Sequence, residues 1–142
     1  MMKIKSNLME AQTGTAGKVM PTTLGGRVRV ASGTVVPAEA APAGTVLELV
    51  SLPKDARILP ASQIHFEAGQ NSDLTVKVGD SAKSDRYLPV TAVGGVNKTM
   101  TLNGSIFTDY ILPGEMTVFA TTGGAELAAG KKIVFDILYV VD

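Results

Sequence analysis

The sequence predicts an all-β chain, folded as an antiparallel two-sheet sandwich of the jelly-roll kind with an irregular, extended N-terminal arm. Three observations lead to this fold class. Residues that favour strands are frequent, since the 142 residues include 16 Val and 14 Thr. The 15 Gly and 7 Pro are spread along the chain as turn signals rather than clustered. After residue 26 these signals recur about every 8–12 residues, which is the spacing of short strands in a sandwich or barrel.

The chain is expected to have two regions. Residues 1–26 mix Gly, Pro, Thr and Gln with isolated apolar residues and show no sustained period, so they are predicted to form the arm. Residues 27–142 are predicted to form the sandwich domain. Its first strand is expected at residues 27–31, with the two valines on one face and the two arginines on the other.

The remaining strands are expected in apolar or alternating segments bounded by turn residues. These segments are residues 45–52, 57–59, 62–68, 73–79, 86–91, 98–102, 105–110, 116–122 and 131–141. The short turn between residues 62–68 and 73–79 predicts a hairpin. A second hairpin is predicted across Asn103-Gly104, which is a strong hairpin signal.

Two of these strands carry further information. Pro89 predicts that its strand lies at the edge of a sheet, because proline cannot donate to the strand ladder. The strand at residues 131–141 is the longest, and it is apolar on both faces because Val134, Leu138 and Val140 alternate with its other apolar residues. Such a strand is either covered on both sides or covered once and buried in an interface.

Charge is distributed unevenly although the formal net charge is +0. Residues 1–30 contain five basic residues and one acidic residue, so the rest of the chain carries an excess of acid. A basic arm on an acidic body suits docking to an acidic neighbour or head-to-tail association of copies. The balanced total predicts no nucleic-acid partner. No apolar run approaches the roughly 20 residues of a membrane span, and no secretory signal is recognisable, so synthesis in a cytoplasm is expected.

The residue types in the chain do not favour a catalytic function. There is no Cys, which excludes disulfides, thiolate metal sites and Cys nucleophiles. The single histidine, His65, lies on the polar face of its predicted strand, where a surface or interface role is favoured over that of a catalytic base. Asp80, Ser84 and Asp85 gather in one loop without the spacing of a calcium loop, so turn formation is favoured there. No phosphate loop or nucleophile elbow is present, and neither an enzyme activity nor a cofactor or metal is predicted.

Residues 46–59 form a predicted strand–turn–strand unit that is similar to one in small structural proteins of tailed bacteriophages, with Asp55 where the family carries Gly. Residues 74–80 and 84–88 resemble a second unit, and residues 130–142 resemble the C-terminal strand. The resemblance covers about residues 45–142. It is to the capsid cement, or decoration, proteins, which are jelly-roll proteins bound to the outside of an icosahedral head.

The resemblance implies a structural virion protein that stabilises the shell by bridging major capsid protein subunits. The expected partners are the major capsid protein and the chain itself, as a homodimer or alternatively a homotrimer, and the expected location is the capsid exterior after synthesis in the bacterial host cytoplasm. The arm is expected to contact the capsid through its basic and apolar residues. These residues are Lys3, Ile4, Lys5, Leu8, Met9 and Lys18.

Three alternatives stay open. A virion-borne adhesion or carbohydrate-binding module would use Tyr87 and Tyr110, the two tyrosines near turns, as platforms for sugars. A head–tail or tail component would share the sandwich fold, because fold does not fix function. An enzyme would depend on His65.

Overall fold

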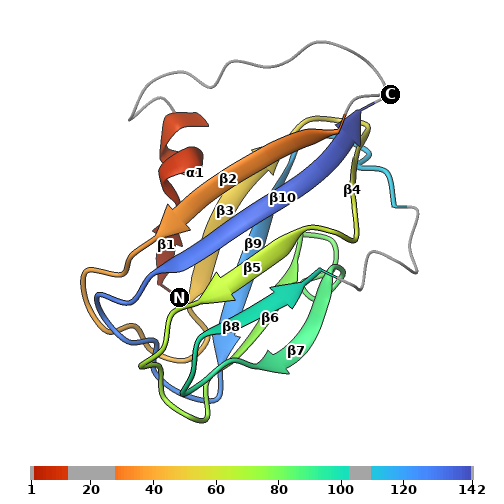
Figure 1. Ribbon diagram of the computed structural model, residues 1–142. Coiled ribbons are helices and arrows are strands. Elements are labelled where there is room, and N and C mark those ends of the chain that lie inside the picture. Colours follow the sequence, from red (N-terminus) through yellow and green to blue (C-terminus); the bar gives the residue numbers. More distant parts are fainter. Residues whose placement is uncertain (1, 13–27, 103–109, 142) are drawn as a thin grey trace.

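The computed structural model describes residues 2–12, 28–102 and 110–141. Ten strands and one short helix lie in these residues (Figure 1). The elements are β1 (Lys3–Lys5), α1 (Asn7–Gln12), β2 (Arg29–Val35), β3 (Val46–Leu52), β4 (Ala56–Ile58), β5 (Gln63–Phe66), β6 (Thr75–Gly79), β7 (Leu88–Ala92), β8 (Lys98–Thr101), β9 (Met116–Gly123) and β10 (Ile133–Val141). No helix among the described residues is long and apolar enough to cross a membrane.

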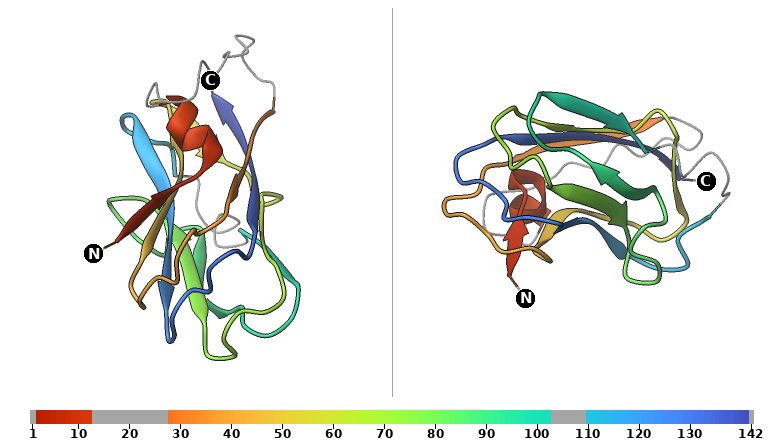
Figure 2. Two further views of the ribbon diagram at one scale, coloured as in Figure 1. Left: turned by 90° about the vertical axis from the view of Figure 1, so that its left-hand side faces the viewer. Right: turned by 90° about the horizontal axis from the view of Figure 1, so that it is seen from below.

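The strands form two sheets that pack face to face (Figures 1 and 2). One sheet has the order β1-β3-β9-β6-β7, and the other has the order β2-β10-β5-β8, with β4 pairing beside one end of β10. The antiparallel pairs are nested in the sequence: β2 with β10, β3 with β9, β5 with β8, and β6 with β7. This nesting is the topology of a jelly roll. The predicted all-β jelly-roll sandwich is therefore confirmed.

The core lies between the inner faces of the sheets, where side chains alternate inward and outward along each strand. In β5, Ile64 and Phe66 are buried, as predicted. In β10, Ile133, Phe135 and Ile137 are buried on the same face. The strand containing Pro89 lies at the end of its sheet, as its sequence predicted.

The predicted hairpin of residues 62–68 and 73–79 is wrong. β5 pairs with β8 and β10, whereas β6 pairs with β7 and β9 in the opposite sheet. The connection crosses between the sheets, and its Gln70 is buried, with Oε1 accepting a hydrogen bond of 2.9 Å from the Ala128 amide. The connection between β5 and β6 is therefore a packed crossover from one sheet to the other, not the tight turn of a hairpin. The other predicted hairpin includes residues 103–109, which lie outside the described residues, although its first strand forms β8.

The expectation of an irregular arm does not hold for residues 2–12. β1 pairs in parallel with β3 at the edge of its sheet, and α1 follows directly. The helix contacts both β2 and β3 and closes one side of the sandwich between the two sheets (Figure 2). Residues 13–26 lie outside the described residues, so a division of the chain at residue 26 stays a prediction.

Candidate functional site

The N-terminal segment is held on the sandwich by a buried serine. Ser6 is fully buried, its amide donates a 2.9 Å hydrogen bond to the Glu48 carbonyl, and its hydroxyl donates to the Leu49 carbonyl. The same hydroxyl accepts a 2.9 Å hydrogen bond from the Met9 amide, three residues along. Ser6 is thus the N-cap of α1, because it satisfies a backbone amide that the first turn leaves without a helical partner.

A glycine in β2 allows α1 to approach the sheet. The Asn7 side chain accepts a 3.0 Å hydrogen bond from the Thr34 amide. A Cβ atom on the neighbouring Gly33 would lie 2.7 Å from Asn7 Oδ1 and 2.6 Å from the Phe135 ring. Any side chain at this position would therefore push the helix and the core ring apart.

The predicted capsid-contact residues in β1 are divided between the two faces of the strand. Lys3 and Lys5 are exposed, whereas Ile4 is partly buried and packs against the core. The Lys3 ammonium lies 3.9 Å from a carboxylate oxygen of Glu48 on the neighbouring strand. The two lysines are thus available at the surface, and Ile4 anchors the strand.

The other predicted contact residues are placed differently. Met9 is 7% exposed, so it holds α1 against the sandwich rather than facing outward. Leu8 lies in α1, and Lys18 lies outside the described residues. Of the four predicted residues whose side chains the structure describes, Lys3 and Lys5 are exposed, whereas Ile4 and Met9 pack toward the sandwich.

The loop between β6 and β7 is built around a buried carboxylate. Asp80 is 1% exposed, and its Oδ1 accepts 3.0 Å hydrogen bonds from the Ala82 and Lys83 amides. Its Oδ2 accepts from Arg86 Nε at 3.0 Å and from the Tyr87 hydroxyl at 3.1 Å. These donors bond to both oxygens of the carboxylate within the loop. This agrees with the turn-forming role that the sequence favours for Asp80. No group of three His, Cys, Asp or Glu that could hold a metal ion occurs in the described residues.

The two tyrosines predicted as sugar platforms are both engaged. Tyr87 is 1% exposed, and burial together with the Asp80 carboxylate raises the pKa of its hydroxyl well above the usual value. Tyr110 carries the Arg86 guanidinium 3.5 Å from its ring centre, in a cation–π contact. Tyr87 is therefore too buried to serve as the sugar platform that the adhesion alternative would require.

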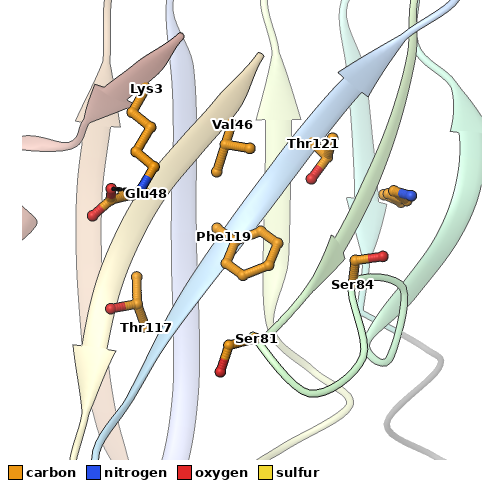
Figure 3. Close-up of a pocket in the computed structure, with 9 residues that line it drawn as sticks. Lys3, Val46, Glu48, Ser81, Ser84, Thr117, Phe119 and Thr121 are labelled. Carbon is orange, nitrogen blue, oxygen red and sulfur yellow. Dashed lines mark ion pairs between the residues drawn. The ribbon is translucent and has the colours of Figure 1, made fainter. Parts of the chain in front are cut away.

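A hollow of about 570 Å³ lies on the outer face of the β1–β3–β9–β6 part of its sheet. Phe119 lies in the middle of the labelled residues in Figure 3 and is half-buried. The residues around it are Lys3, Val46, Glu48, Lys77, Ser81, Ser84, Thr117 and Thr121. This site was not predicted from the sequence, because every phenylalanine falls in a strand pattern. The alternation Thr117-Phe119-Thr121 nevertheless places Phe119 on the same strand face as two polar residues.

The outer face of the other sheet carries a strip of aliphatic side chains. Val28 and Val30 are 54% and 60% exposed, and the strip continues across β10 through Leu138 and Val140. Val30 and Leu138 are partners in the β2–β10 register. This valine strip, formed by Val28, Val30, Leu138 and Val140, is exposed at its two β2-side valines and partly exposed on β10. The outer face of β10 therefore has the apolar character that is typical of an interface.

The polar residues beside the valine strip bond to one another. Ser32 donates a 2.5 Å hydrogen bond to Asp136 across the β2–β10 pair. Nδ1 of His65 lies 2.6 Å from the Thr99 hydroxyl across the β5–β8 pair. His65 is thus one of a cross-strand pair on the sheet surface, in line with the surface role favoured from sequence.

No family model matches the chain, and no curated protein matches its sequence. Three solved structures share its fold. A chain in the capsid of Ralstonia phage GP4 superposes with a TM-score of 0.76 at 19% identity, covering 99% of this chain and 98% of that chain. A chain of the cyanophage Pam1 capsid asymmetric unit gives a TM-score of 0.60 at 16% identity, covering 87% and 91%.

The third structure is the acidic stable capsid of Helicobacter pylori bacteriophage KHP30, where a chain gives a TM-score of 0.53 at 19% identity over 83% and 90% of the two chains. At these identities the comparisons establish a shared fold. The resemblance to phage capsid proteins found in the sequence is thus confirmed at the level of the fold, over nearly the whole chain in the case of phage GP4.

Proposed function

We propose that the chain is a structural protein of a phage virion that binds the outer surface of an icosahedral capsid and stabilises the shell by bridging major capsid protein subunits. The observation that carries this proposal is the superposition on a chain of the phage GP4 capsid over 99% of the present chain. The likeness extends to the N-terminal segment as well as the sandwich, since almost no residue is left out of it. In this proposal the chain is not an enzyme and uses no cofactor.

In this proposal the exposed lysines of β1 contact the capsid. Lys3 and Lys5 project from an edge strand that buried Ser6 and partly buried Ile4 hold in place. A rigid pair of cations suits an acidic surface on the capsid, and many such contacts repeated over a symmetric shell add by avidity. Lys18 extends the same basic segment.

The chain itself is the second proposed partner, as a homodimer or alternatively a homotrimer. The valine strip supports this, because an exposed aliphatic patch on a sheet face suits contact between protein surfaces. The proposed location is the exterior of the capsid, reached after synthesis in the host cytoplasm.

Counting the chain in purified virions tests the proposal directly. Quantitative mass spectrometry would measure the copies of this chain for each copy of the major capsid protein. A ratio of one, or a simple fraction of one, is expected for a protein that covers the lattice. A handful of copies in each particle would instead place the chain at a vertex or in the tail, and absence from the particle would overturn the proposal.

A charge reversal tests the contact surface. We expect Lys3→Glu combined with Lys5→Glu to weaken binding to heads that lack this protein by at least about tenfold, because both side chains are exposed and the backbone pairing of β1 is kept. Co-sedimentation measures the bound fraction. Lys98→Glu, an equally exposed change on β8, is the matched control. Equal binding by the double variant and the control would remove β1 from the contact.

A further inference from the structure

The hollow around Phe119 contains polar groups that the protein itself leaves unbonded. Its rim carries the hydroxyls of Ser81, Ser84, Thr117 and Thr121. None of these hydroxyls forms a hydrogen bond with a described residue, in contrast to Ser32 on the opposite face. Unbonded hydroxyls gathered around a concave surface are free to bond to a bound molecule or to water.

The floor of the hollow is aromatic. The Phe119 ring is half-buried, so one part of it packs on the sheet and the other part faces the hollow. Val46 lies next to it in Figure 3 and widens the apolar floor. An apolar floor with polar groups at the rim is the usual composition of a small-molecule site, and a volume of about 570 Å³ falls within the usual range.

The hollow carries charges of both signs on opposite sides. Lys77 on β6 pairs with Thr121 on β9, and Glu48 on β3 pairs with Phe119 on β9. The two charged residues therefore lie two strand spacings, about 10 Å, apart across the sheet, and they are offset by two residues along it. Glu48 has Lys3 as a neighbour at 3.9 Å, whereas Lys77 has no ion pair with a described residue. One cation of the site is therefore free to meet an anionic group.

The position of the hollow on the face of a sheet limits what can fill it. The backbone groups of β3, β9 and β6 are bonded to one another in the ladders, so the face offers only side chains. An extended peptide would find no backbone partners there, since strand addition takes place at sheet edges. A sugar has one apolar face of C–H groups for an aromatic ring and hydroxyls around its rim, which match Phe119 and the four side-chain hydroxyls.

We propose that this hollow binds an oligosaccharide that carries a carboxylate, with a sugar ring against Phe119 and the carboxylate beside Lys77. Glu48 accepts hydrogen bonds from sugar hydroxyls on the opposite side. This activity goes beyond the proposed capsid role, and it places sugar recognition on a different surface from Tyr87 and Tyr110.

A glycan microarray tests the proposal with the full chain in solution. Each acidic oligosaccharide is printed beside its carboxyl-reduced counterpart, which keeps the same ring and linkage but lacks the charge. We expect binding to one or more acidic glycans, reduced by about tenfold or more on the matching neutral form. Phe119→Ala is expected to abolish the signal, and Lys77→Gln is expected to lower it to the level of the neutral form. Lys98→Gln on β8 is the matched control and is expected to bind normally.

Folding of each variant is checked by circular dichroism and by its melting temperature. Should Phe119→Ala not fold, Thr117→Val with Thr121→Val removes two rim hydroxyls at nearly constant volume and is expected to lose binding in the same way. The absence of a signal on every printed glycan would overturn the proposal, as would equal binding to acidic and carboxyl-reduced forms or full binding by Phe119→Ala. Because the capsid takes no part, this result is independent of the counting of virions.

Discussion

Two regions on the outer faces of the two sheets, the valine strip and the hollow around Phe119, differ in how their polar groups are bonded. On the β2–β10–β5–β8 sheet, Ser32 and Asp136 bond to each other, and aliphatic side chains such as Val30 remain exposed. On the other sheet, Lys77 and the hydroxyls around Phe119 have no partner among the described residues. A region whose polar groups are already bonded within the protein loses little free energy when another protein excludes water from it. A face with unsatisfied groups favours a polar ligand, so one jelly roll offers two different surfaces.

The largest expected effect on stability comes from Asp80, which holds the loop that carries Ser81 and Ser84 at one side of the hollow. This loop is the wall of the hollow. Asp80→Asn should lower the free energy of unfolding by about 3–5 kcal/mol, because the amide nitrogen would meet the donors of Arg86 and Tyr87 and leave a buried cation without its anion. Urea unfolding measures the change. Asp85→Asn, an exposed change in the same loop, should stay within about 0.5 kcal/mol of the parent protein. Similar stability of both variants would mean that Asp80 does not hold this wall.

The next-largest expected effect is on self-association through the valine strip. Leu138→Lys places a charge in the middle of the valine strip and should weaken self-association by about 30-fold, or about 2 kcal/mol, with little change in stability. Analytical ultracentrifugation measures the association. Thr101→Lys adds the same charge to an exposed position of the same sheet, away from the strip. If Thr101→Lys dissociates the chain as strongly, then net charge rather than the strip governs association.

A smaller effect concerns the edge strand beside the hollow. Ser6→Ala should lower stability by about 1–2 kcal/mol, because it removes the N-cap of α1 and the bond to the Leu49 carbonyl. Thermal unfolding measures the loss. Ser81→Ala, which removes an unbonded and exposed hydroxyl, should leave the melting temperature unchanged. An unchanged melting temperature for Ser6→Ala as well would show that the segment does not depend on this serine.

The smallest effect is a pH dependence in the loop of the hollow. The pKa of Tyr87 is raised in the folded state, so the unfolded chain releases this proton first when the pH rises above about 10. The stabilising contribution is thus complete below pH 10 and is lost progressively above it. Tyr87→Phe should lower stability by about 1 kcal/mol at pH 7 and make the alkaline decline shallower. Urea unfolding at pH 7 to 11 checks this, and parallel curves for both proteins would contradict it.

The sequence predicted those strands that bury only one face, because a half-buried strand alternates with period 2. β5 and β6 are examples, with Ile64 and Val76 in the core. The pairing of the strands was harder to predict, because local alternation does not indicate which distant segments pair with each other. The crossing at Gln70 looks like a hairpin turn in sequence, and only its burial against Ala128 distinguishes it.

The site was less predictable than the fold. α1 has six residues, too few for an apolar period, so only the serine before it indicates a helix start. Phe119 shows how a strand residue that looks like core can belong to the surface. Asp55 stands where the resembling turn carries Gly, and its φ of 70° lies in the left-handed region that Gly favours and Asp tolerates.

The place of β10 at the middle of its sheet has a consequence for how the chain acquires its structure. β10 follows every other strand in sequence, yet it pairs with β2, β4 and β5. The bond between Ser32 and Asp136 joins residues 104 positions apart. During synthesis, the edges of β2 and β5 that pair with β10 therefore stay unpaired until the residues of β10 have left the ribosome. Such long-range closure favours slow folding and makes incomplete chains prone to aggregate, so the yield of native protein should depend strongly on temperature and chaperones.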